Sequence, residues 1–109
     1  MERYDIAIIG TGPAGLSAAV TAAIRKKKIL LVGSRDLSSK VQKAQEIQNY
    51  LGFPDISGAE LGKAFEEHID RMQVPIVEDR VNLIYPMGDY FSLQVGQDIC
   101  EADAVILAT

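Results

Sequence analysis

Residues 6–15 read IAIIGTGPAG, an apolar run that leads into a loop with glycine at positions 10, 12 and 15. The run is short and ends at a glycine, which is typical of a buried parallel strand over residues 4–9. Residues 13–27 are rich in alanine, and their larger apolar residues recur at helical spacing. Residues 29–32, ILLV, supply a second buried strand. This stretch therefore predicts a β-α-β unit with a glycine-rich turn between its first strand and its helix.

Each glycine of this loop has its own physical role in that prediction. Gly10 permits the tight turn out of the strand, Gly12 leaves no Cβ between the backbone and a pyrophosphate, and Gly15 lets the helix pack closely on the sheet. The helix aims free N–H groups and a partial positive charge at the phosphates. Pro13 suits the first turn, because its missing N–H has no helical partner there. The loop therefore predicts a dinucleotide site.

The end of the second predicted strand leaves the identity of the nucleotide open. Many folds of this kind place an acidic residue about 20 positions further on, where it accepts hydrogen bonds from the ribose hydroxyls. Here Gly33 stands at the end of the strand, and Ser34, Arg35 and Asp36 follow it. Arg35 is either a contact for a 2′-phosphate, which would make NADPH the ligand, or an ordinary loop cation.

A long connection and a second helix follow. Residues 34–58 are polar and irregular, and loops of this length tend to be functional. Ser57 with Glu60 three residues later forms a capping box, which predicts the start of a helix. Apolar residues then share one helical face, so we expect this helix to run to about Gln73.

The last third of the chain predicts strands. A third short strand is expected in 75–79, and hairpin-like turns at PMGD and VGQD separate candidate strands in 81–85, 90–95 and 98–108. The final segment is apolar on both faces, which indicates a return to the middle of the sheet. The predicted fold class is α/β, a Rossmann-like wound parallel sheet with a small antiparallel β flap.

Composition excludes several function classes. The chain has 109 residues, 48% of them hydrophobic, which is enough for the core of one small domain. Its net charge of -4 gives no basic field, so we expect no nucleic-acid partner. No apolar run approaches the roughly 18 residues that a membrane span needs, and we expect a cytoplasmic protein that does not bind membranes. Cys100 is the only cysteine, so no disulfide or dithiol pair forms within these residues.

Several stretches together resemble the thioredoxin reductase group of flavoprotein pyridine-nucleotide oxidoreductases. They are YDIAIIGTGPAGLSAAV (4–20), IQNYLGFPDISGAELGKAFEEHI (47–69) and ADAVILAT (102–109), which match the group in content, order and approximate spacing. The first motif is shared with many flavin and nicotinamide proteins, whereas the second is far more specific. The resemblance implies an FAD-dependent oxidoreductase that takes electrons from NAD(P)H, passes them to a disulfide or a similar small acceptor, and forms a homodimer.

The resemblance also implies which residues hold the cofactor, and it favours FAD over NADPH in the glycine loop. Carried over by position, the cofactor-binding residues are Gly10, Thr11, Gly12, Pro13, Ala14 and Gly15 around the FAD diphosphate, Gly33 and Ser34 beside the adenosine ribose, Asn49 toward the flavin, Val81 at the adenine, and Ala108 and Thr109 close to the cofactor. Ala108 and Thr109 match the start of an Ala-Thr-Gly turn. A glycine at position 33 occurs among members of the group.

The chain departs from the group at two places. LSSKVQKAQE (37–46) stands where a Gly-Gly-Gln-Leu stretch often contacts the flavin, and Leu51 replaces the usual proline. Members of the group also carry a second nucleotide domain and a Cys-x-x-Cys pair, and these 109 residues contain neither. We therefore expect residues 1–109 to be the N-terminal portion of an FAD-binding domain, in a fragment of a longer chain.

No side chain of this sequence is predicted to be catalytic. His68 is either a proton donor or a partly buried helix residue, and we prefer the second interpretation. Cys100 has no basic neighbour in sequence, which favours a structural thiol. Tyr50 and Phe53 either stack near the flavin or pack their loop onto the core. No cluster has the spacing of a metal site. The alternatives to FAD binding in an enzyme are an NADPH-binding domain and a stand-alone, non-enzymatic nucleotide-binding module.

Overall fold

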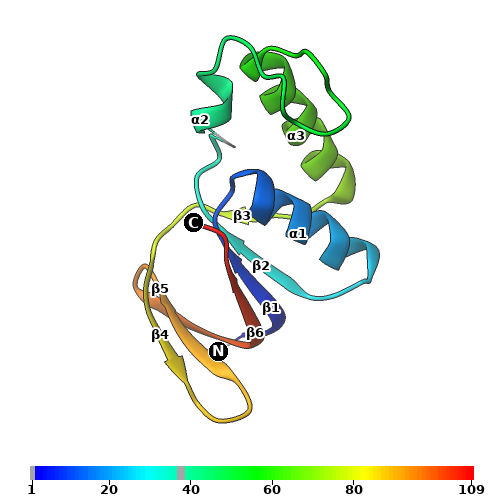
Figure 1. Cartoon of the computed structure of the whole chain (residues 1–109). Coiled ribbons are helices and arrows are strands. Elements are labelled where there is room, and N and C mark those ends of the chain that lie inside the picture. The colour runs from blue at the N-terminus through cyan, green and yellow to red at the C-terminus, as the bar shows by residue number, and fades with distance from the viewer. Residues whose placement is uncertain (1, 37–38) are drawn as a thin grey trace.

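The computed structural model describes residues 2–36 and 39–109 and builds them into one six-stranded sheet with the two longer helices against one face (Figure 1). Its elements are, in chain order, β1 (Arg3–Ile9), α1 (Pro13–Ile24), β2 (Ile29–Val32), α2 (Ser39–Gln42), α3 (Gly58–Met72), β3 (Ile76–Val77), β4 (Val81–Pro86), β5 (Phe91–Val95) and β6 (Asp98–Leu107). The strand order is β3-β2-β1-β6-β5-β4. The strands β3, β2, β1 and β6 run parallel, and β5 and β4 add an antiparallel flap. The predicted fold class is confirmed.

The last strand returns to the middle of the sheet, as its apolar sequence predicted. β6 pairs in parallel with β1, with Ile6 opposite Ala104 and Ile9 opposite Leu107. Its other edge pairs antiparallel with β5. Because the carboxyl ends of parallel strands share one edge of a sheet, the end of β6 lies beside the point where β1 enters the glycine loop.

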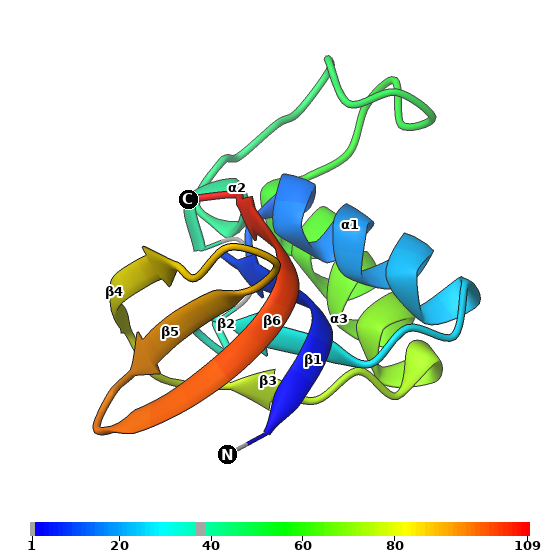
Figure 2. The same ribbon diagram turned by 90° about the horizontal axis from the view of Figure 1, so that it is seen from below.

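The sheet is packed on both faces. Side chains alternate along β1, so that Ile8 faces the helices while Ala7 and Ile9 face away from them. The core between sheet and helices contains the buried residues Ile8, Leu16, Ala19, Leu31, Ile69 and Val74. The core on the opposite face, where the β4–β5 hairpin curls against the sheet (Figure 2), contains Ala7, Ile9, Leu30, Val32, Leu93, Val95 and Ala102. The loop at the end of β1 is therefore anchored by a strand buried on both sides.

Helix α1 ends at Ile24, earlier than the predicted end near Lys27. Lys26 adopts a left-handed conformation with φ of 57°. The N–H of Lys26 donates to Ala23 O across 2.9 Å, and the N–H of Lys27 donates to Ala22 O across 3.0 Å. This pair of bonds is a Schellman motif, which usually has glycine where Lys26 stands. The alanine-rich pattern gives no signal for this stop, so the prediction was three residues too long at this end.

Helix α3 begins as predicted. Ser57 is its N-cap and accepts a hydrogen bond from the N–H of Glu60 across 3.1 Å, while the Ser57 hydroxyl donates to the Glu60 carboxylate across 2.9 Å. Gln73 ends the helix in a left-handed conformation. The short helix α2 was not predicted. Within the described residues, no helix is long and apolar enough to cross a membrane.

Candidate functional site

The glycine loop joins β1 to α1, and the fold itself requires two of its glycines. A Cβ at Gly10 would collide with the carbonyl oxygen of Ala108, and the φ of Gly10 is +122°, which L side chains rarely adopt. A Cβ at Gly15 would collide with the carbonyl oxygen of Gly10 and lie 3.5 Å from the Ala108 Cβ. These glycines let β1, α1 and the end of β6 meet at one point.

Gly12 is different, because a Cβ there would meet no protein atom within 4 Å. Its φ of -79° and ψ of -175° suit any residue, so neither packing nor conformation requires glycine. Gly12 is the N-cap of α1, and the first intrahelical bond runs from the Leu16 N–H to the Gly12 carbonyl across 3.0 Å. The N–H groups of Ala14 and Gly15 come before Leu16 in the chain and therefore have no acceptor within the helix.

The start of α1 has the electrostatics of an anion site. In the described part of the chain, its first turn carries no acidic side chain, and no side chain caps it. The partial positive charge of the helix start thus faces the open space at Gly12 without compensation from the protein. A phosphate group placed there would accept the free N–H groups, and a side chain at position 12 would obstruct it.

The end of β2 closes against the same loop through Thr11. Thr11 is 7% exposed, and its hydroxyl donates a hydrogen bond to the Ser34 carbonyl across 2.9 Å. A Cβ at Gly33 would lie 2.5 Å from Thr11 Cγ2. The Gly33 N–H donates to the Val77 carbonyl of β3 across 3.1 Å. The structure thus brings Gly33 and Ser34 next to the glycine loop.

Arg35 points along β3. Its guanidinium donates to the Ile76 carbonyl across 3.4 Å, and its Nε lies 3.9 Å from a carboxylate oxygen of Glu78. The side chain is exposed, and the carboxylate partly balances its charge. These contacts favour the interpretation of Arg35 as a loop cation over that of a 2′-phosphate contact.

The remaining predicted residues divide into two groups. Ala108 and Thr109 join the glycine loop, because the Ala108 oxygen and the Thr109 nitrogen lie around the position that a Cβ of Gly10 would take. Asn49 is exposed in the connection between α2 and α3. Val81 begins β4 and packs against the core on the flap side of the sheet. Thus the residues predicted to contact the diphosphate and the ribose lie together with Ala108 and Thr109. Asn49 and Val81 lie on separate elements.

The aromatic residues of the central connection pack on the helix that follows. The Tyr50 ring lies 5.5 Å from the Phe65 ring of α3 and 6.3 Å from the Phe53 ring, measured between centroids. The N–H of Phe53 donates to the Tyr50 carbonyl across 2.9 Å and closes a turn. These contacts favour the interpretation in which Tyr50 and Phe53 pack their loop onto the core.

Two glycines of α3 that allow α2 to pack closely on it were not predicted from the sequence. A Cβ at Gly58 would collide with the carbonyl oxygens of Val41 and Ala44, and one at Gly62 would lie 2.5 Å from Gln42 Cγ. The spacing of Gly58 and Gly62, four residues apart on one helix face, is the signal that would have indicated a close contact. Helix α2 falls within the divergent stretch 37–46, whose first two residues lie outside the described ones.

His68 lies on α3 and Cys100 on β6, and neither belongs to the glycine loop. The prediction that His68 is partly buried is wrong, because it is exposed on α3, whose buried face is formed by residues such as Leu61 and Ile69. Burial raises the pKa of the Cys100 thiol, and the nearby Asp98 carboxylate adds to the effect. The described residues include no group of three or more His, Cys, Asp or Glu able to hold a metal ion.

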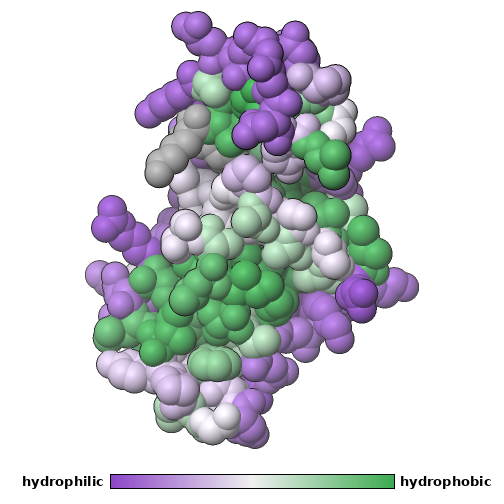
Figure 3. Space-filling model, viewed as in Figure 1, coloured by the Kyte–Doolittle hydropathy of each residue, from purple (hydrophilic) through white to green (hydrophobic). Residues whose placement is uncertain are grey.

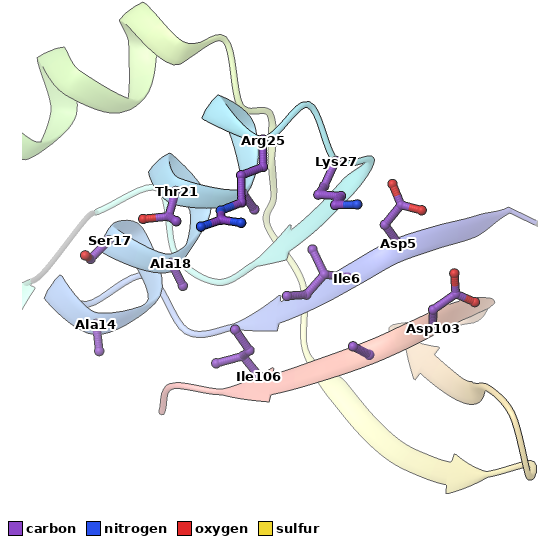
Figure 4. Close-up of a pocket in the computed structure, with 12 residues that line it drawn as sticks. Asp5, Ile6, Ala14, Ser17, Ala18, Thr21, Arg25, Lys27, Asp103 and Ile106 are labelled. Atoms are coloured by element: carbon purple, nitrogen blue, oxygen red, sulfur yellow. The ribbon is translucent and has the colours of Figure 1, made fainter.

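A separate apolar trough of about 740 Å³ runs between α1 and the β1–β6 pair (Figure 4). Ala18 of α1 faces Ile6 of β1 and Ile106 of β6 across it. Charged residues, among them Asp5 and Asp103, stand at one end. Figure 3 shows an apolar surface over β6 and toward the β4–β5 hairpin, in contrast to the hydrophilic end formed by the connection between α2 and α3.

Comparison with known proteins identifies the family. The sequence profile of the pyridine nucleotide-disulphide oxidoreductases matches residues 4–109. The chain belongs to the pyridine nucleotide-disulphide oxidoreductase family. Within this family, a thioredoxin reductase of Ureaplasma parvum is 32% identical over 108 residues, which are 99% of this chain and 35% of that protein.

Solved structures of the family agree with the fold. A ferredoxin-flavin thioredoxin reductase from Clostridium acetobutylicum is 54% identical with a TM-score of 0.93, and the match covers 98% of this chain and 37% of that one. A thioredoxin reductase from Streptococcus pyogenes is 33% identical with a TM-score of 0.88, over 98% of this chain and 35% of that one. The chain therefore spans about a third of the length of the relatives it matches.

Proposed function

We propose that this chain binds FAD in a flavoprotein oxidoreductase of the thioredoxin reductase kind, which moves electrons through the flavin to a disulfide or a similar small acceptor. The observation that carries the proposal is the open space at Gly12, where the uncompensated start of α1 meets a backbone that has no need of glycine for its own packing. FAD supplies the electron-transfer chemistry, and the protein binds and orients it.

The residues of this chain would each hold a defined part of the cofactor. The N–H groups of Gly12, Ala14 and Gly15 donate to the diphosphate. The main chain at Gly33 and Ser34 lies beside the adenosine ribose. From the family resemblance alone, we assign Asn49 to the flavin end and the Val81 backbone to the adenine. No side chain of these residues is assigned to proton or electron transfer.

Two electron donors are candidates. The family as a whole and the resemblance in sequence favour NAD(P)H, which delivers a hydride to the flavin. A specific observation favours ferredoxin, an iron–sulfur electron carrier: the chain is 54% identical to a ferredoxin-flavin thioredoxin reductase, against 33% for a thioredoxin reductase of Streptococcus pyogenes. Two reduced ferredoxins, each giving one electron, together with one proton from solvent, would replace one hydride.

We also propose that residues 1–109 form the N-terminal portion of an FAD-binding domain in a cytoplasmic homodimer. The relatives are about three times as long as the matched region, and the trough beside α1 exposes apolar side chains such as Ile106, which is 36% exposed. Light scattering measures the molar mass of the intact protein in solution. A homodimer would have twice the mass of one chain, and a mass equal to one chain would contradict this proposal.

The experiment on function is an anaerobic titration of the purified intact protein. We expect bound flavin absorbance that bleaches with NADPH, NADH or reduced ferredoxin and recovers when a disulfide substrate is added. The donor that bleaches it decides between the two candidates. A colourless protein that binds NADPH would place NADPH in the glycine loop, and a protein that binds FAD but exchanges electrons with none of these donors would favour a non-enzymatic module.

A further inference from the structure

We infer that Thr11 determines how this site recognises the ribose of its nucleotide: the Thr11 side chain excludes any side chain at position 33 and holds the Ser34 carbonyl, so that the end of β2 offers main chain in place of a carboxylate. The inference deepens the proposed function and rests on it, since it concerns the adenosine half of the proposed ligand.

The exclusion is steric. A Cβ built on Gly33 would lie 2.5 Å from Cγ2, 2.8 Å from Oγ1 and 3.1 Å from Cβ of Thr11. Gly33 does not have the positive φ that marks Gly10, so its backbone conformation is open to other residues. The Thr11 side chain is therefore what keeps position 33 empty.

Thr11 has little freedom to move aside. It is 7% exposed, and its β-branched side chain is restricted at χ1. Its hydroxyl donates to the Ser34 carbonyl across 2.9 Å, and rotation would break this bond in a buried place. Gly33 is fixed from the other side, because its N–H donates to the Val77 carbonyl of β3.

The lack of a side chain at position 33 limits the hydrogen bonds that the end of β2 can offer to a ribose. In many dinucleotide folds a carboxylate at the end of this strand accepts hydrogen bonds from the ribose hydroxyls, and bonds to a charged acceptor are strong. Here no side chain occupies position 33, and the neighbouring side chain of Ser34 is a neutral hydroxyl, which accepts the Asp36 N–H across 3.0 Å. The site therefore takes an adenosine nucleotide chiefly by its diphosphate, and the ribose 2′-hydroxyl contributes little to affinity.

The test is a double-mutant cycle in the intact protein, freed of flavin, with ADP and 2′-deoxy-ADP as probes. Gly33→Asp is made alone and together with Thr11→Gly. Alone, we expect Gly33→Asp to raise the unfolding equilibrium constant by about 30-fold or more, and in the Thr11→Gly background by only a few-fold. The wild type should prefer ADP over 2′-deoxy-ADP by less than about fivefold, and the double variant by about tenfold or more.

A milder cycle keeps the test decisive if the double variant does not fold. It pairs Gly33→Ala with Thr11→Ala, which removes Cγ2 and Oγ1, the two atoms nearest to the new Cβ. Thr21→Ala, at an exposed threonine of α1, is the control and should leave the cost of Gly33→Ala unchanged.

The outcomes separate this inference from the proposed function. Equal costs of Gly33→Ala in the Thr11 and Thr11→Ala backgrounds would overturn the inference, as would a wild type that binds FAD and prefers ADP over 2′-deoxy-ADP by tenfold or more. A wild type that binds neither FAD nor ADP would overturn the proposed function, and the ribose inference would fall with it.

Discussion

The N–H of Ala108 donates a hydrogen bond to the carbonyl of Ile9 across 2.8 Å, which ties the residue after β6 to the last residue of β1. Gly10 follows Ile9, and the Ala108 carbonyl occupies the place that a Cβ of Gly10 would need. Residues almost a hundred positions apart therefore shape one turn. The candidate site is complete only when β6 has returned to the middle of the sheet.

Gly10→Ala tests the contact between Ala108 and the turn that follows β1. We expect it to lower the free energy of unfolding by about 2 kcal/mol or more, because the alanine combines an unfavourable φ of +122° with a collision against the Ala108 carbonyl. Urea denaturation of the intact protein measures the loss. Gly88→Ala is the matched control, since Gly88 also has a positive φ, of +94°, but its Cβ would meet open space. Equal losses for the two variants would show that the contact with Ala108 costs nothing.

Ile106→Lys tests whether the trough beside α1 is covered in the intact protein. If it is covered, a lysine there buries an unpaired charge, and we expect a loss of about 3 kcal/mol in the free energy of unfolding. Ile99→Lys, at a 54% exposed position of the same strand, is the control and should cost much less. Similar small losses at both positions would mean that the trough stays open to solvent.

The Cys100 thiol gives a pH-dependent prediction. Burial and Asp98 raise its pKa in the folded state, so the unfolded chain loses this proton at lower pH than the folded chain does. The stability that the neutral thiol contributes is present below the unfolded pKa and is lost as the pH rises through the folded one. The rate of reaction with a thiol reagent should therefore rise at higher pH in the native protein than in urea, and Cys100→Ser should remove the signal. A native profile at or below the denatured one is the contrary result.

The parts of the fold that were predictable are those with local patterns. The glycine loop between an apolar strand and an alanine-rich helix, and the capping pair Ser57 and Glu60, each lie within a few residues. The end of α1 and the short helix α2 were not predicted, because they lack such a local signal. The left-handed Lys26 stands where glycine usually marks a helix end, and the four residues of α2 are too few to show a helical period.

The candidate site was predictable only in part, for the same reason. The spacing of the glycines indicates where a phosphate lies, and family resemblance added Ala108 and Thr109. The contact between Thr11 and Gly33 joins two loops at the ends of neighbouring strands, and nothing in the local sequence of either loop indicates it. The spacing did predict separate roles for the three glycines, in agreement with Gly12 facing open space while Gly10 and Gly15 face backbone.

The most direct test of FAD binding by this loop is the dissociation constant of FAD for the Gly12→Val variant of the intact protein. A Cβ at position 12 meets no protein atom within 4 Å, but valine is less favourable than glycine at the N-cap of α1, so we expect the free energy of unfolding to fall by about 1 kcal/mol. Ala59→Val, at an exposed residue in the first turn of α3, is the control for folding and should cost about 0.5 kcal/mol. The side chain at position 12 would stand where the diphosphate lies, and we expect FAD affinity to fall by about 100-fold or more, while Ala59→Val leaves it unchanged. A Gly12→Val protein that keeps wild-type affinity for FAD would contradict the account.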